Sequence, residues 1–186
     1  MSVKLDVIQL RRRGKVLGTR ALGGEVAEQI RASDPDADAL ILNFTGVRVA
    51  SSPFLDELVR ATRAAVADHP DRHVVYGGLD EDVLDTLGLV AERLGATLTV
   101  LEGEKLQVLG GRRFLEETLA AAQELGEFTA TELAERLELK LPNLHQRLTQ
   151  LQAAGAITRT DDPTAQRGRR LKFATPDVGE LADAVC

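Results

Sequence analysis

The order of apolar and polar positions divides the chain into two parts. Up to about residue 102, short apolar runs that are typical of strands alternate with amphipathic segments that are typical of helices. The run DALILNF, Asp38–Phe44, is almost continuously apolar, which predicts a strand covered on both faces. Because strands alternate with helices, we expect an α/β domain in which helices pack on a mixed sheet.

Local signals predict further elements in this first part. The segments LDVIQL and KVLGT flank Arg11–Gly14 and are expected to pair as a hairpin. Residues 52–68 have helical spacing, with an apolar face made of Leu55, Leu58, Val59, Thr62 and Val66. Another helix is expected to begin at an N-cap, Asp80, and to stop at Gly95.

After Arg112 the pattern is mainly helical until a final hairpin. Thr129 and Glu132 have the spacing of a capping box at a helix start. A second helix begins near Leu141, has Pro142 in its first turn, and carries an apolar seam of Leu144, Leu148 and Leu151. The segments AITRT and RRLKFA then have the pattern of two strands joined by a polar loop, DDPTAQRG. This order predicts a mainly α winged helix-turn-helix domain.

The stretch ELAERLELKLPNLHQRLTQLQAAGAI, followed by RGRR, resembles the ArsR and MarR types of bacterial repressor across roughly residues 112–176. In those families a helix ending in ELAxxL precedes the recognition helix, and a wing containing GR follows. The resemblance implies a bacterial or phage transcription regulator that binds double-stranded DNA as a homodimer. ArsR-type repressors often sense metals through cysteines, but this region has no cysteine and only His145. Any signal is therefore expected to enter elsewhere.

The distribution of charge favours the same partner. The net charge of −6 alone argues weakly against nucleic acid, but residues 139–153 and 163–174 contain no acid. We therefore expect DNA contacts from the second helix and from the wing. On the helix, Asn143, His145, Gln146 and Thr149 lie off the leucine seam, and the resemblance to the repressors implies that Leu141, Asn143, His145 and Gln146 face the groove. In the wing, the expected contacts are Arg167, Arg169, Arg170 and Lys172. The alternative is a helix-turn-helix that serves dimerisation or protein docking.

The stretch NFTGVRVASSPFLDEL resembles the STAS fold of anti-sigma-factor antagonists and, more closely, a STAS-like family of unknown function, over roughly residues 3–102. The family pattern Ser-x-Phe-x-Asp-Glu-Leu is fitted by Ser52, Phe54, Asp56, Glu57 and Leu58. The resemblance implies a sensor or docking domain, with Ser52, Phe54, Asp56 and Glu57 as candidate docking residues for a histidine-kinase-like ATPase.

The two serines of this stretch have two possible roles. In the antagonists a phosphorylated serine blocks docking of the partner, and phosphorylation of Ser51 or Ser52 stays open here. Pro53 stands at the usual phosphosite position and lacks an N–H group. This favours Ser52 as the N-cap of the following helix, with Pro53 as its first residue.

Composition narrows the function classes further. No apolar run approaches the roughly 18 residues that a membrane span needs, so no membrane partner is expected. The one cysteine is Cys186, and the N-terminal segment does not have the pattern of a signal peptide, so we expect a cytoplasmic protein. His69 and His73 lie beside Asp71 in a segment expected to be solvated. Because no catalytic motif or metal-spaced histidine pair occurs, we expect a non-enzyme without cofactor or metal.

These patterns predict a STAS-like domain over residues 1–102, a linker over 103–111 and a winged helix-turn-helix domain over 112–186. Within the linker, KLQVL also has the pattern of an edge strand. The helix Arg112–Leu125, apolar at Phe114, Leu115, Leu119 and Ala122, is either a dimer contact or packs within its own domain. Two functions fit: a DNA-binding transcriptional regulator that senses a ligand or partner, or an adaptor that docks a histidine-kinase-like ATPase and dimerises through its winged helix.

Overall fold

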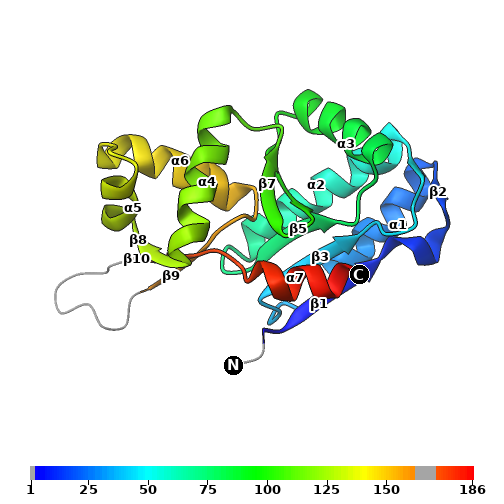
Figure 1. Ribbon diagram of the computed structural model, residues 1–186. Coiled ribbons are helices and arrows are strands. Elements are labelled where there is room, and N and C mark those ends of the chain that lie inside the picture. The colour runs from blue at the N-terminus through cyan, green and yellow to red at the C-terminus, as the bar shows by residue number, and fades with distance from the viewer. Residues whose placement is uncertain (1–2, 162–170) are drawn as a thin grey trace.

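The computed structural model describes residues 3–161 and 171–186 and has a mixed α/β fold. Its main sheet has five strands in the order β1-β3-β5-β6-β7 (Figure 1). The first four run parallel and β7 runs antiparallel to β6. The strands are β1 (Leu5–Gln9), β3 (Ala39–Asn43), β5 (His73–Gly77), β6 (Leu98–Glu102) and β7 (Lys105–Leu109).

Three helices cover one face of this sheet: α1 (Arg20–Arg31), α2 (Ser52–Asp68) and α3 (Glu81–Arg93). Because side chains alternate along a strand, Leu40 and Leu42 of β3 pack towards these helices, whereas Ala39 and Ile41 belong to the core on the other face. The predicted cap of α3 is confirmed, since Asp80 Oδ1 accepts a hydrogen bond from the Val83 N–H at 3.0 Å. Both faces of the sheet are thus apolar, and each must be shielded from water by other elements.

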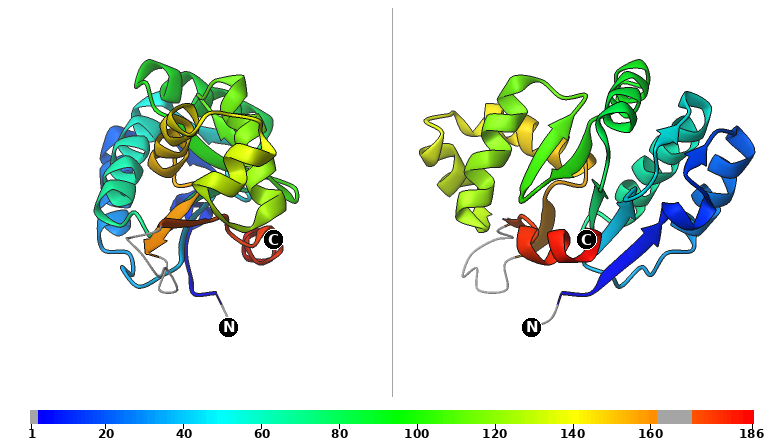
Figure 2. Two further views of the ribbon diagram at one scale, coloured as in Figure 1. Left: turned by 90° about the vertical axis from the view of Figure 1, so that its left-hand side faces the viewer. Right: turned by 45° about the vertical axis from the view of Figure 1, so that its right-hand side comes forward.

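The second part of the chain covers the opposite face (Figure 2). Ile41 and Val75 of the main sheet share a core with Leu119 and Leu181 from this part. The parts expected as residues 1–102 and 112–186 therefore share one core. The covering elements are α4 (Arg113–Leu125), β8 (Glu127–Thr129), α5 (Ala130–Arg136), α6 (Leu141–Ala153), β9 (Thr158–Asp161), β10 (Leu171–Ala174) and α7 (Val178–Val185).

The segment after α6 enters the main sheet between β5 and β6. The ladder between these strands contains only the pairs Tyr76–Val100 and Gly77–Leu101. Next to this short ladder, the Val74 N–H donates to the Gly155 carbonyl at 3.2 Å, and Thr99 Oγ1 donates to the Ala154 carbonyl at 2.7 Å. Residues 154–157 are all buried. This segment, which we call the wedge, therefore joins the second part of the chain to the backbone of the sheet.

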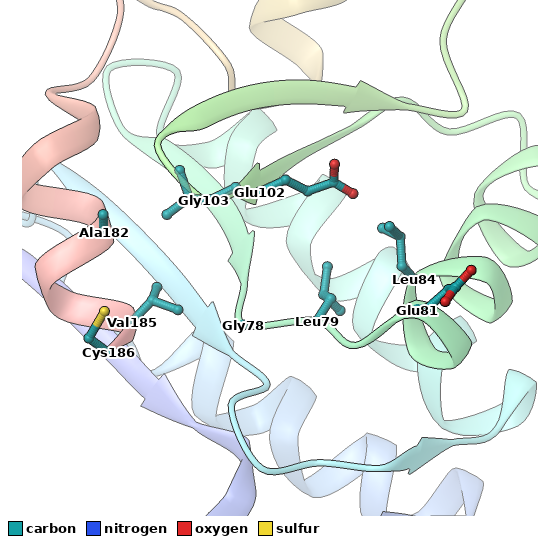
Figure 3. A pocket seen from close by; sticks show the side chains of 10 residues that line it. Gly78, Leu79, Glu81, Leu84, Glu102, Gly103, Ala182, Val185 and Cys186 are labelled. Carbon is teal, nitrogen blue, oxygen red and sulfur yellow. The ribbon is translucent and has the colours of Figure 1, made fainter.

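The end of α7 lies against the carboxyl ends of β3 and β5. The Val185 carbonyl accepts hydrogen bonds from Asn43 Nδ2 at 3.2 Å and from Thr45 Oγ1 at 2.9 Å. A hollow of about 480 Å³ lies beside it, and Figure 3 shows Val185 on one side with Leu79 and Leu84 on the other. α7 thus occupies part of the edge at which parallel α/β sheets commonly bind ligands.

One predicted connection is wrong, and one alternative that stayed open is confirmed. The segments flanking Arg11–Gly14 do not form a hairpin, because β1 pairs with β3, and β2 (Val16–Leu17) pairs with β4 (Val49–Ala50), both in parallel. Between them, Leu10–Arg13 form a 3-10 helix, η1, whose Leu10 is fully buried. Within the expected linker 103–111, the alternative that KLQVL forms an edge strand is confirmed, since it is β7 at the edge of the main sheet, and Leu106 and Val108 of this strand are buried against the second part of the chain. In both places, apolar side chains are buried against elements that are distant in the sequence, and this burial determines how the strands pair.

Candidate nucleic-acid interface

The helix α5 begins at the predicted capping box. Thr129 Oγ1 accepts a hydrogen bond from the Glu132 N–H at 3.3 Å, and Glu132 Oε2 accepts one from the Thr129 N–H at 2.7 Å. This backbone hydrogen bond, together with that from the Thr129 hydroxyl, lowers the pKa of Glu132. Leu133 and Ala134 are buried on the inner side of the helix. The reciprocal bonds fix the start of α5 beside the core.

A tight turn joins α5 to α6. Glu138 has a φ of +54°, in the left-handed region that favours glycine. The Leu139 N–H donates to the Ala134 carbonyl at 2.9 Å, and the Glu138 N–H donates to the Glu135 carbonyl at 3.2 Å. These two bonds are those of a Schellman motif, which closes a helix and sets the direction of the chain beyond it. The turn therefore positions α6 relative to α5.

This geometry predicts opposite effects of glycine at two nearby positions. Glu138→Gly should leave the free energy of unfolding unchanged or raise it, because glycine adopts positive φ without a steric cost. The control Glu135→Gly lies within α5, where glycine should cost about 1 kcal/mol. Urea unfolding of both variants measures the difference. A larger loss for Glu138→Gly than for Glu135→Gly would contradict the left-handed turn.

The helix α6 turns a polar side towards solvent. The predicted seam of Leu144, Leu148 and Leu151 is buried, as the spacing indicated. All five predicted groove-facing residues are exposed, and the Thr149 hydroxyl donates to the His145 carbonyl at 2.9 Å within the helix. They are Leu141, Asn143, His145, Gln146 and Thr149. The helix is therefore seated by its leucines and leaves hydrogen-bonding side chains free of the core.

Arg147 has a different place from the other polar residues of α6. Its guanidinium lies 4.8 Å from the ring centroid of Phe114, and its Nη1 donates to Thr118 Oγ1 at 3.1 Å. Arg147 thus fastens α6 to α4 and is not an outward cation. On α4 the apolar positions Leu115, Leu119 and Ala122 are buried in the shared core, and Arg147 covers part of Phe114. The apolar side expected as a dimer contact is therefore used within the chain.

A small antiparallel sheet joins β8, which precedes α5, to β9 and β10, which follow α6, in the order β8-β10-β9. Phe128 of β8 and Phe173 of β10 stack with their ring centroids 5.7 Å apart. The predicted contact residue Lys172 is half-buried on β10. The other predicted wing residues, Arg167, Arg169 and Arg170, lie outside the described part of the chain. Of the two strands that border residues 162–170, β10 lies next to α5, and β9 pairs with the other side of β10.

The cap of α2 is Ser51, not Ser52. Ser51 Oγ accepts a hydrogen bond from the Phe54 N–H at 3.3 Å and donates one to the Gly18 carbonyl at 2.9 Å. Ser52 is the first residue of the helix, and Pro53 is its second residue, one position later than predicted. The prediction missed the cap by one residue because either serine gives the same sequence signal. The contact that distinguishes Ser51 from Ser52 as the cap is the hydrogen bond to Gly18, which is distant in the sequence.

The predicted docking residues on α2 do not form an exposed surface. Phe54 is fully buried in the core, and 7% of the Asp56 side chain is exposed. Burial raises the pKa of Asp56, but hydrogen bonds from Arg60 and Arg20 outweigh it and hold the pKa below its ordinary value. Arg93 also binds Asp56 at 2.9 Å, and the half-buried Glu57 pairs with Arg20. The docking prediction is therefore wrong for Phe54 and Asp56, whose side chains hold helices together.

His73 is buried, although its sequence context predicted a solvated segment. It begins β5, and 6% of its surface is exposed. Burial lowers the pKa of His73 from 6.5 to about 4, against a smaller opposite effect of the Gly155 and Ala156 carbonyls. The imidazole is therefore neutral near pH 7. The position of His73 at the start of the apolar run HVVYG was the sequence signal for its burial.

Comparison with known proteins assigns no family to this fold. No protein-family model matches the chain, and no curated protein is significantly similar to it. Within residues 3–161 and 171–186, no helix has both the length and the apolar character needed to cross a membrane. Arguments about function therefore rest on the geometry of the interface.

Proposed function

We propose that the protein binds duplex DNA through the exposed side of α6. The observation that carries the proposal is the two-sided character of this helix. Leu144, Leu148 and Leu151 hold it on the core, while Asn143 and Gln146 remain exposed. Amide side chains of this kind can pair with adenine edges in the major groove, which is wide enough to admit a helix. The hydroxyl of Thr149 and the ring of His145 extend the same polar side.

The order of elements around α6 supports this proposal. The chain runs α4-β8-α5-α6-β9-β10, and its small sheet has the order β8-β10-β9. A winged helix-turn-helix requires a helix of this kind beside such a sheet, with the loop between the last two strands as its wing. Lys140 and Arg159 are exposed near α6 and β9 and add positive charge, which phosphates attract. The sequence of residues 162–170, which lie outside the described part of the chain, contains three arginines and would add further positive charge.

Regulation of transcription as a homodimer is part of the same proposal. A two-fold operator would bind two copies, each placing α6 in one major-groove segment. Because α4 is occupied by the shared core, the contact between the copies would use another surface. The alternative adaptor function loses support, because Phe54 and Asp56 of its docking surface are buried.

The test is selection of bound duplexes from a random pool, followed by titration of the selected duplex at several salt concentrations. Affinity should fall as salt rises, and Arg169→Ala with Arg170→Ala should reduce the slope of log K against log salt by about 2. Asn143→Ala with Gln146→Ala should weaken binding about tenfold or more and relax sequence preference. Gln29→Ala, an exposed amide on α1, is the matched control and should change nothing. Failure to retain any duplex at low salt would refute the proposal.

A further inference from the structure

A second cavity, of about 490 Å³, lies between the main sheet and the small sheet. Asp38 and His73 line it at the amino-terminal ends of β3 and β5, and Thr158 and Thr160 line it from β9. Leu181 of α7 contributes an apolar surface. A cavity of this volume is within the range of small-molecule sites. Its walls come from both parts of the chain.

The side chains around this cavity carry negative charge. Asp38, Asp71, Glu127 and Asp177 line it, and its described lining contains no lysine or arginine. Asp177 caps α7 through the Glu180 N–H at 3.2 Å, and Asp38 accepts a hydrogen bond from the Lys4 N–H at 2.7 Å. The carboxylates of Asp71 and Glu127 make no hydrogen bond or ion pair within residues 3–161 and 171–186. They come from different walls, since Asp71 precedes β5 and Glu127 begins β8.

His73 provides an independent observation at the same place. It lines the cavity with 6% of its surface exposed, and its Nδ1 has no hydrogen-bond partner among the described residues. A buried polar nitrogen without a partner costs free energy, so native proteins usually satisfy such groups. A neutral imidazole has one nitrogen that accepts a hydrogen bond and one that donates. A ligand with N–H groups can therefore satisfy a group that the chain leaves without a partner.

We propose that this cavity binds a small organic cation that carries protonated amino groups. Ammonium groups donate up to three hydrogen bonds each and neutralise carboxylates, while the hydroxyls of Thr158 and Thr160 offer further acceptors. A compact alkyl chain between two such groups matches the separate carboxylates and the apolar surface of Leu181. A metal ion fits less well, because the described residues contain no group of three or more His, Cys, Asp or Glu placed to hold one. The inference concerns binding alone and does not depend on the proposed binding of DNA.

Calorimetric titration with 1,4-diaminobutane, at pH 7.5 and constant ionic strength, tests the proposal. We expect saturable binding, weakened about tenfold by Asp71→Asn and again by Glu127→Gln, because a hydrogen bond to a charged group is lost each time. Glu92→Gln, an exposed acid on α3 without an ion pair in the described residues, is the matched control and should bind as the wild type does. Equal affinity in all variants would place the binding elsewhere and overturn the proposal.

The histidine rings give a second measurement on the same samples. The chain has three histidines, so their NMR signals are few enough to follow individually. The diamine should shift the His73 signals and leave those of the exposed His145 on α6 unchanged. An equal shift of His73 by sodium chloride or magnesium chloride at matched ionic strength would show only general screening and would contradict the site. The absence of both a saturable heat and a His73 shift would also overturn it.

Discussion

Replacing Gly155 with alanine is expected to reduce the free energy of unfolding by about 3 kcal/mol or more, because a left-handed conformation and a steric clash are imposed together. Gly155 has a φ of +73°, and a Cβ at this position would lie 2.8 Å from Val74 N and 3.0 Å from Val74 O. Backbone atoms of a buried strand cannot move aside as the end of a flexible side chain can. The wedge would have to leave the sheet to relieve the clash.

Gly95 provides a matched control for this substitution. It also lies just past the end of a helix, with a φ of +58°, and its N–H donates to the Glu92 carbonyl as that of Gly155 donates to the Gln152 carbonyl, but a Cβ there would meet no atom within 4 Å. Gly95→Ala should therefore cost only the left-handed conformation, about 1 kcal/mol. Urea unfolding of both variants gives the difference, which reports the clash alone. Equal losses would show that residues 154–157 do not enter the sheet as described.

Acidification from pH 6.5 to pH 4 is expected to remove about 3 kcal/mol of stability through His73 alone. The pKa of this residue is about 4 in the folded chain, compared with its ordinary value of 6.5. Between these two pKa values His73 is protonated in the unfolded chain and neutral in the folded chain. The free energy of unfolding therefore rises with pH in this range. The stability that depends on neutral His73 is complete above pH 6.5 and is lost as the pH falls towards 4.

Unfolding by urea at several pH values between 4.5 and 7.5 measures this dependence. His73→Gln should flatten it, whereas His145→Gln, on the exposed side of α6, should leave it as in the wild type. Because His73→Gln also alters a buried position, an NMR titration of the His73 ring in the wild type provides a direct measurement of its pKa. Among the acidic side chains at the cavity, Asp38 favours protonation of the ring, but its effect is smaller than that of burial. A measured pKa near 6.5 would show that burial does not dominate.

Local sequence signals predicted the elements of the candidate interface well. The capping box of Thr129 and Glu132 and the leucine seam of α6 each depend on residues within one or two turns, and the structure confirms both. The same holds for Asp80 at the start of α3. Features of this kind are fixed by hydrogen bonds and periodicity that a single segment contains.

Contacts between distant segments were the features that the sequence did not reveal. The parallel pairing of β1 with β3 was mistaken for a local hairpin, because the pairing register depends on a strand 34 residues away, as in the pair Leu5–Ala39. Asp56 was expected on a docking surface, yet Arg20 and Arg93 approach it from two other helices. The spacing of Phe54 to Leu58, one helical turn, did indicate that Phe54 faces the core. The family resemblance was given more weight there than the periodicity.

The shared core also determines when the sheet can be completed during synthesis. Ile41, Val75 and Val108 lie on a face that only residues beyond 112 cover. As the chain leaves the ribosome, this apolar face therefore stays open to solvent until α4 and the later elements emerge. The gap between β5 and β6 is likewise filled only after the wedge, residues 154–157, has been synthesised. The first half of the nascent chain therefore exposes apolar surface that the completed fold buries.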